Sequence, residues 1–168
     1  VLGWRDVPTD PRDLGQIALS AEPRIAQAFI DGRGLAGEEL ERRLYMARKR
    51  CEKHVADAFG EAAEAMYICS MSCMTINYKG MFMAHQLGSY YPDLSDERVL
   101  SAMAIVHQRY STNTFPSWKL AQPFRFLAHN GEINTLSGNV NKMRARELHM
   151  ASPLFGDDID DLFPVVIR

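Results

Sequence analysis

Long hydrophobic runs, a strong excess of one charge and a regular set of cysteines are all missing from this sequence. No apolar run approaches the ~20 residues that a membrane-spanning helix needs, and no signal peptide is visible, so we expect no membrane partner. The formal net charge of -2 gives no electrostatic reason to expect nucleic acid as a partner either.

The three cysteines, Cys51, Cys69 and Cys73, are an odd number at irregular intervals. This pattern is unlike a secreted disulfide framework, and reduced thiols in a cytoplasmic protein are the better interpretation. No CxxC pair and no His/Cys cluster indicates a metal site. The acidic run at 156–161 lacks the glycine and the terminal glutamate of a calcium loop, so we interpret it as an ordinary loop and expect no bound metal.

At 168 residues and 46% hydrophobic content, the chain is long enough for one domain, or most of one, with a sizeable core. The clearest element is a helix between Gly37 and Gly60, with two glutamates in its first turn and a glycine at its end. Its basic run at 48–50 is interpreted as the solvated face. The apolar stripe of this helix comprises Leu40, Leu44, Ala47, Cys51, Val55 and Phe59.

The other segments predict a mixture of strands and helices in one domain of the α+β class. Strands are expected at 24–30, at 66–77 (two strands with a turn), at 102–106 and at 124–128. Helices are expected at 81–91 and 136–150.

The stretch from His107 to Asn134 carries polar groups directly after two of these predicted strands. A site on a rigid scaffold is commonly built in this way. Arg109 follows the first strand, and its guanidinium is a good two-pronged donor for a carboxylate, with Thr112 nearby. An internal salt bridge that holds the loop down is at least as common for an arginine in this position, so both interpretations stay open.

The pair Asn130-Gly131 follows the second strand and also has two interpretations. Asn-Gly is the commonest two-residue hairpin turn, although the polar residues that follow would make a poor partner strand. The alternative is an oxyanion hole, in which the Asn side-chain amide and the Gly backbone N–H donate to a developing negative oxygen. The residue types alone do not decide between them.

Five segments of the sequence together resemble the glutamine amidotransferase domain of the glutamate synthases, over nearly the whole chain. The longest and most specific runs from 107 to 139 and contains HQRYSTNTFPSW followed by AHNGEINT. The others are VLGWRDVP at 1–8, AEPRIAQAFI at 21–30, TINYKGM at 75–81 and MRARE at 143–147.

This resemblance implies an N-terminal-nucleophile hydrolase fold, a four-layer αββα sandwich, of which residues 1–168 are the central part of the domain. Such a domain hydrolyses glutamine to glutamate and ammonia, and the ammonia passes to a synthase site for reductive amination of 2-oxoglutarate. The resemblance implies that Arg109, with Thr112 close by, binds the substrate carboxylate. It implies that Asn130 and Gly131 stabilise the oxyanion.

The resemblance also implies parts that these residues do not supply. The nucleophile is an N-terminal cysteine with its own α-amino group as base, expected upstream of Val1, and an aspartate for the substrate amino group is expected after Arg168. FMN, an iron–sulfur cluster and an electron donor (an NADPH-linked small subunit or ferredoxin) are expected in the rest of the parent enzyme, none of them in this segment. We expect the segment alone to be inactive.

Two rival hypotheses remain. The chain could be a non-catalytic glutamine-binding or structural segment of the same fold, or a hydrolase that pairs Cys69 or Cys73 with His107. The second is disfavoured, since a thiol in an apolar strand is usually a small core residue with a raised pKa.

Overall fold

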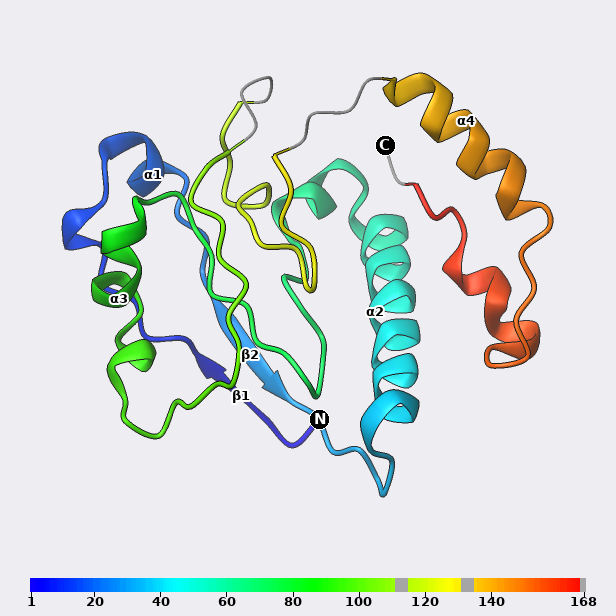
Figure 1. Cartoon of the computed structure of the whole chain (residues 1–168), viewed down its shortest axis with the longest axis horizontal. Helices are drawn as coiled ribbons and strands as arrows, with labels where there is room; N and C mark the ends of the chain where they lie inside the picture. The colour runs from blue at the N-terminus through cyan, green and yellow to red at the C-terminus, as the bar shows by residue number, and fades with distance from the viewer. Residues whose placement is uncertain (111–114, 131–134, 167–168) are drawn as a thin grey trace.

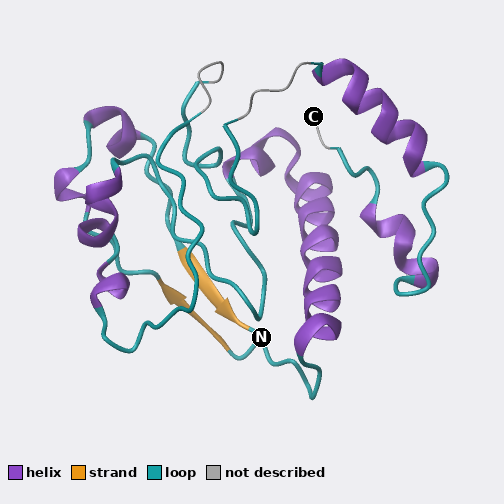
Figure 2. Ribbon diagram, viewed as in Figure 1, coloured by secondary structure: helices purple, strands orange, loops and turns teal. Residues whose placement is uncertain are grey.

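The structure is a computed structural model that describes residues 1–110, 115–130 and 135–166. In these residues helices and turns predominate over strands (Figures 1 and 2). The strands are β1 (Gly3–Asp6) and β2 (Ala26–Phe29), and the α-helices are α1 (Gln16–Ser20), α2 (Gly37–Phe59), α3 (Leu87–Tyr90) and α4 (Leu136–Glu147). Short 3₁₀ helices are η1 (Pro11–Asp13), η2 (Gly60–Ala65), η3 (Ala84–Gln86), η4 (Pro92–Ser95) and η5 (Gly156–Leu162).

Strands β1 and β2 form an antiparallel pair whose register runs from Gly3 opposite Phe29 to Asp6 opposite Ala26. The strand predicted at 24–30 is therefore confirmed. Arg5 lies opposite Gln27, and its Nε donates to the Gln27 side-chain oxygen at 2.7 Å, a cross-strand pair that reinforces the register. In Figure 1 the strand pair stands between α1 and α3 on one side and α2 on the other.

Aromatic side chains form the main core, beside β1 and the α3 region. Tyr90 and Tyr91 pack edge to face with ring centroids 4.7 Å apart, and Trp118 lies 5.6 Å from Tyr90. The buried members of this core are Val7, Ala18, Tyr90, Tyr91 and Trp118. The Trp118 indole N–H donates to the Ala18 carbonyl at 3.0 Å, so its one polar group is satisfied inside the core. This bond fixes the start of the 118–130 segment to α1.

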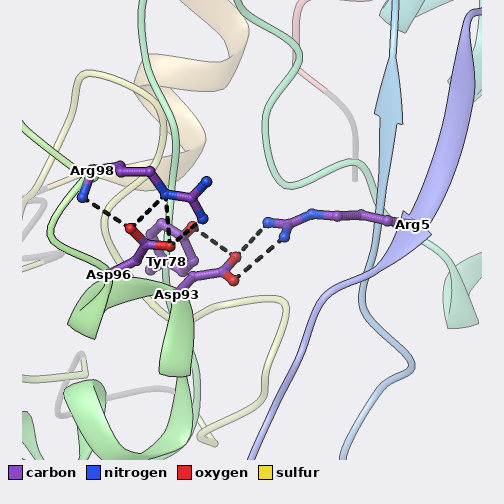
Figure 3. A network of polar contacts seen from close by, with 5 residues as sticks. All are labelled: Arg5, Tyr78, Asp93, Asp96 and Arg98. Carbon is purple, nitrogen blue, oxygen red and sulfur yellow. Dashed lines mark hydrogen bonds and ion pairs between the residues drawn. The ribbon is translucent and has the colours of Figure 1, made fainter.

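Figure 3 shows a polar network that includes Tyr78, a residue packed against this core. Arg5, on β1, forms an ion pair with Asp93 in η4, and the Tyr78 hydroxyl donates to the same carboxylate at 3.2 Å. Asp96 and Arg98 pair beside it, with Arg98 almost fully exposed. Asp93 thus joins three segments that are distant in sequence, whereas the Asp96–Arg98 pair is local.

Helix α2 has the bounds that the sequence predicts, with Gly60 at its end in a positive-φ conformation (φ 55°) that favours glycine. Its predicted apolar stripe is only partly right. Leu44 is buried, but Ala47, Cys51 and Phe59 are exposed, and the buried face instead includes Glu41 and Lys49. The reason is that the segments packed on this face offer hydrogen-bonding groups, which periodicity of apolar residues cannot reveal.

The basic run at 48–50 is only partly a solvated face, because Arg50 is exposed but Lys49 is buried. Lys49 is 7% exposed and donates to the Pro164 carbonyl at 3.3 Å. Arg50 forms ion pairs with Asp158 at 2.9 Å and Asp161 at 2.6 Å. The acidic segment interpreted as a loop is therefore the 3₁₀ helix η5, docked on α2 through opposite charges.

The helix predicted at 136–150 is confirmed as α4, which begins at the N-cap Thr135. The helix predicted at 81–91 is present only as the short consecutive elements η3 and α3. Helices combined with an antiparallel strand pair agree with the predicted α+β class. The four layers of an αββα sandwich are not visible in the described residues and stay a prediction.

Three predicted strand regions, 66–77, 102–106 and 124–128, are not strands in the structure. Met103 and Val106 are 77% and 72% exposed, and no backbone ladder joins 102–106 to another described segment. Residues 124–127 form a tight turn in which Phe124 and Leu127 exchange backbone hydrogen bonds of 2.7 and 2.8 Å. Apolar, β-branched sequence favours strands, but a strand exists only where a partner supplies hydrogen bonds.

Candidate active site

The structure describes two of the four predicted site residues, Arg109 and Asn130. Thr112 and Gly131 lie outside the described residues, so the placement predicted for them stays a prediction. The imidazole of His107 connects the two that are described. Its Nε2 lies 2.8 Å from the Asn130 side-chain oxygen, and its Nδ1 accepts a hydrogen bond from the Arg109 backbone N–H at 3.1 Å. Two motifs that are 23 positions apart in the sequence therefore meet here.

A hollow of about 340 Å³ opens beside this contact, lined by His107, Ala128, His129 and Asn130. All four residues belong to the two motifs that the sequence singles out. Arg109 is not among the lining residues, but its backbone N–H is hydrogen-bonded to His107, which is one of them. The volume is within the range that small-molecule sites occupy. A slightly larger hollow, about 370 Å³, lies beside the exposed Asp6–Arg24 ion pair and contains none of the predicted site residues.

Arg109 is exposed, and its guanidinium has no carboxylate within ion-pair distance in the part of the chain that the structure describes. Two other arginines differ in this respect: Arg98 pairs with Asp96 and Arg125 with Glu41. The internal salt bridge proposed as an alternative for Arg109 is thus absent from the described residues. An exposed guanidinium of this kind can donate two parallel hydrogen bonds to a substrate carboxylate.

The backbone on the Asn130 side is held by the side chain of Gln122. Its Nε2 donates to the His129 carbonyl at 2.5 Å, and its Oε1 accepts from the His129 N–H at 2.6 Å. A single amide thereby satisfies both backbone groups of the residue that precedes Asn130. The chain between them turns at Arg125 and Phe126, so the hairpin alternative for Asn130-Gly131 loses the strand that would form its first arm.

This turn is tied to α2 by a group that we call the Glu41 cluster: Glu41, Ser72, Cys73 and Arg125. The Glu41 carboxylate accepts from the Ser72 hydroxyl at 2.8 Å, the Cys73 N–H at 2.5 Å and the Arg125 guanidinium at 2.6 Å. Burial opposes the charge of Glu41, but these hydrogen bonds outweigh it and lower its pKa from 4.5 to about 2. The carboxylate is therefore ionised over the physiological range.

The segment at 75–81 holds the site in place through hydrogen bonds. The Lys79 ammonium is 7% exposed and donates to the carbonyls of Lys119 and Ala121 at 3.0 and 2.9 Å, next to Gln122. Burial lowers the pKa of this ammonium, and the rings of Tyr67 and Phe124 lie against it. The Gly80 carbonyl accepts from the Tyr110 hydroxyl at 3.1 Å. Segment 75–81 thus anchors both motifs of the site.

Neither Cys69 nor Cys73 has the surroundings of an activated nucleophile. Burial raises the pKa of Cys69, and desolvation together with the Glu41 carboxylate raises that of Cys73. A raised pKa keeps a thiol protonated, and the protonated form is a poor nucleophile. These directions disfavour the hypothesis that Cys69 or Cys73 pairs with His107.

In the described ranges, no group of three or more His, Cys, Asp or Glu side chains could hold a metal ion. Nor does any helix within them combine the length and apolar character needed to cross a bilayer.

Comparison with known proteins identifies the family of this chain. The family model for class II glutamine amidotransferases matches residues 1–168. The chain belongs to the class II glutamine amidotransferases. The large chain of an NADPH-dependent glutamate synthase from Azospirillum brasilense is 52% identical over 167 residues, 99% of this chain. An NADH glutamate synthase from Saccharomyces cerevisiae is 46% identical over 172 residues, 99% of this chain.

A chloroplastic ferredoxin-dependent glutamate synthase from Spinacia oleracea is 46% identical over 165 residues, 98% of this chain. These three relatives are much longer: the chain covers 11%, 8% and 10% of them, respectively. The resemblance to glutamate synthases seen in the sequence is confirmed. Membership in this family implies the N-terminal-nucleophile hydrolase fold at the level of class.

Three contributors to the site were missed by the reasoning from sequence. His107 was noted only as a strand-end residue and as a disfavoured cysteine partner, and neither Gln122 nor Glu41 was proposed for any role. His107 and Gln122 lie inside the same specific stretch as Arg109 and Asn130, which is a usable signal. Nothing in the sequence near Glu41 indicates that it contacts a turn 84 positions away.

Proposed function

We propose that this amidotransferase chain is part of the glutaminase site of a glutamate synthase, which hydrolyses glutamine to glutamate and ammonia. The observation that carries the proposal is the contact between His107 and Asn130, which joins the two specific motifs at one hollow. The named relatives are glutamate synthases, which supports this assignment over other amide hydrolases.

Within this proposal, the side-chain amide of Asn130 donates to the oxygen that becomes negative when a thiolate attacks the glutamine amide carbon. The N–H of Gly131 is the expected second donor. Preorganised donors of this kind stabilise the tetrahedral intermediate more than the substrate, so they lower the barrier to its formation. The intermediate then expels ammonia, and water hydrolyses the resulting thioester to glutamate.

Arg109 is proposed to bind the α-carboxylate of glutamine, with Thr112 beside it. Its unpaired state among the described residues supports this role, because a carboxylate would otherwise have to displace an internal partner. The nucleophile is expected to be an N-terminal cysteine, in keeping with the raised pKa values of Cys69 and Cys73.

The remaining assignments follow from the resemblance. They comprise the αββα four-layer sandwich, with residues 1–168 as its central part, and ammonia transfer to a synthase site that aminates 2-oxoglutarate with FMN and an iron–sulfur cluster. The electron donor differs among the relatives, whose names give NADPH, NADH or ferredoxin. A cytoplasmic location stays a prediction, since one relative is chloroplastic by name.

The test is Asn130→Ala in the full-length protein, with ammonia release from glutamine as the readout. We expect turnover to fall about 100- to 1000-fold, the usual effect of losing one oxyanion donor. Asn139→Ala is the matched control, because Asn139 is an exposed asparagine on α4, away from the hollow. Unchanged turnover in Asn130→Ala would refute the assignment. If glutamine raised the unfolding temperature of the full-length protein but was not hydrolysed, that result would favour a non-catalytic binding role.

A further inference from the structure

An asparagine side chain can present its amide to a hollow in two ways. The C=O and NH₂ groups have nearly the same shape, so a half-turn about the last bond exchanges an acceptor for a donor. Only the orientation with NH₂ toward the substrate can stabilise a negative oxygen. Because Asn130 is exposed, the packing around it does not select one orientation. A neighbouring hydrogen-bonding group must do so.

The contacts of His107 supply that selection. The backbone N–H of Arg109 can only donate, so the Nδ1 that lies 3.1 Å from it must be an acceptor without a proton. In a neutral imidazole the proton then resides on Nε2. Nε2–H therefore donates to the Asn130 oxygen, 2.8 Å away. The reversed amide would face this N–H with its own NH₂, donor against donor, and is disfavoured.

We propose that His107 is a positioning residue which, through the Nε2–H tautomer set by the Arg109 N–H, turns the Asn130 amide so that its NH₂ faces the substrate. This inference rests on the proposed glutaminase function. His107 needs no role in proton transfer. It couples the backbone of the carboxylate-binding motif to the donor of the oxyanion site, so that a displacement of one motif is transmitted to the other.

The variants His107→Gln and His107→Asn separate positioning from simple packing. The Nε2 of glutamine reaches nearly as far from Cβ as the imidazole Nε2 and is also a donor, whereas the shorter asparagine amide reaches only the Nδ1 position. In the full-length protein, His107→Asn is expected to lower kcat for glutamine hydrolysis about 10- to 100-fold, less than complete loss of the oxyanion donor. KM should change little, because Asn130 acts on the transition state. His107→Gln should lose less than His107→Asn but not recover fully, because its amide can reach Asn130 and yet can turn either its donor or its acceptor toward it.

A double-mutant cycle provides the decisive readout. Once Asn130→Ala has removed the amide, His107→Asn should lower kcat no further, since no amide is left to orient. A purely structural role of His107 would reduce kcat by the same factor in either background. His54→Asn, at an exposed histidine on α2, is the matched control and should leave kcat unchanged.

The possible results separate this inference from the proposed function. Hydrolysis that requires Asn130 but tolerates His107→Asn would overturn the inference alone, as would equal losses in His107→Gln and His107→Asn. Absence of hydrolysis by the unsubstituted full-length protein would overturn both. A loss of kcat that is smaller in His107→Gln than in His107→Asn, and absent from His107→Asn in the Asn130→Ala background, would support the positioning role.

Discussion

The Glu41 cluster and the His107–Asn130 pair both join segments that are distant in sequence, but they differ in burial and in unused hydrogen-bonding capacity. Glu41 is 7% exposed and both of its oxygens are occupied, by three donors in all. Asn130 is exposed, its oxygen is engaged by His107, and the hollow lies beside it. A group that holds a fold together uses its capacity internally, whereas a group that serves a substrate must keep some of it available.

The largest effect that this comparison predicts is the loss of stability caused by the substitution Glu41→Ala. This variant would leave the Arg125 charge and the Cys73 N–H without their partner. The free energy that protects α2 against opening should fall by about 3–5 kcal/mol, the usual cost of breaking a buried pair. Hydrogen exchange of α2 amides in the full-length protein measures this loss. Glu39→Ala, in the exposed first turn, is the control, and equal protection in the two variants would contradict the contrast between buried and exposed groups.

The pH dependence of stability offers a second way to sharpen the contrast. Because the pKa of Glu41 is lowered from 4.5 to about 2, its stabilisation is fully present above about pH 4.5 and is lost as the pH falls toward 2. The size of this component is about 3 kcal/mol. Local hydrogen exchange of α2, corrected for intrinsic rates, should show it in the unsubstituted protein. In Glu41→Gln it should be missing; the same acid-induced loss in both proteins would contradict the assignment to Glu41.

Arg109→Ala tests the site side of the comparison, where we expect an effect on substrate binding. Losing a charge-assisted contact of about 1.5–3 kcal/mol should raise the KM for glutamine about 10- to 100-fold, with little change in stability. Steady-state glutaminase kinetics of the full-length protein provide the measurement. Arg98→Ala is the matched control, since Arg98 is an exposed arginine already paired with Asp96. A KM that rises equally in both variants would show that Arg109 has no special role.

The smallest effect is expected for the thiols. Cys69→Ser and Cys73→Ser should each retain glutamine hydrolysis within about twofold, because a thiol with a raised pKa does not supply the attacking thiolate. The same kinetic assay decides the matter. If either serine variant abolished turnover while remaining folded, the hypothesis of an internal cysteine nucleophile would have to be reinstated.

Local signals explain why parts of the fold could be predicted. Helix α2 begins and ends where its acidic first turn and Gly60 indicate, and β2 and α4 also lie where expected. The strands predicted at 102–106 and 124–128 failed because strand propensity cannot show whether a partner strand is available. The burial of Lys49 and the ion pairs of Arg50 were not predicted for a similar reason: their partners lie in residues 158–164, more than 100 positions away.

The sequence by itself determined the family, the bounds of α2 and the candidate residues Arg109 and Asn130, since these depend on residue type and local spacing. Only the tertiary structure decided which groups are hydrogen-bonded across the site: Asn130 with His107, Gln122 with His129, and Glu41 with Arg125. The physical reason is that helix signals act over a few residues, whereas these hydrogen bonds join groups 7 to 84 positions apart. Which of those groups meet depends on the path of the whole chain.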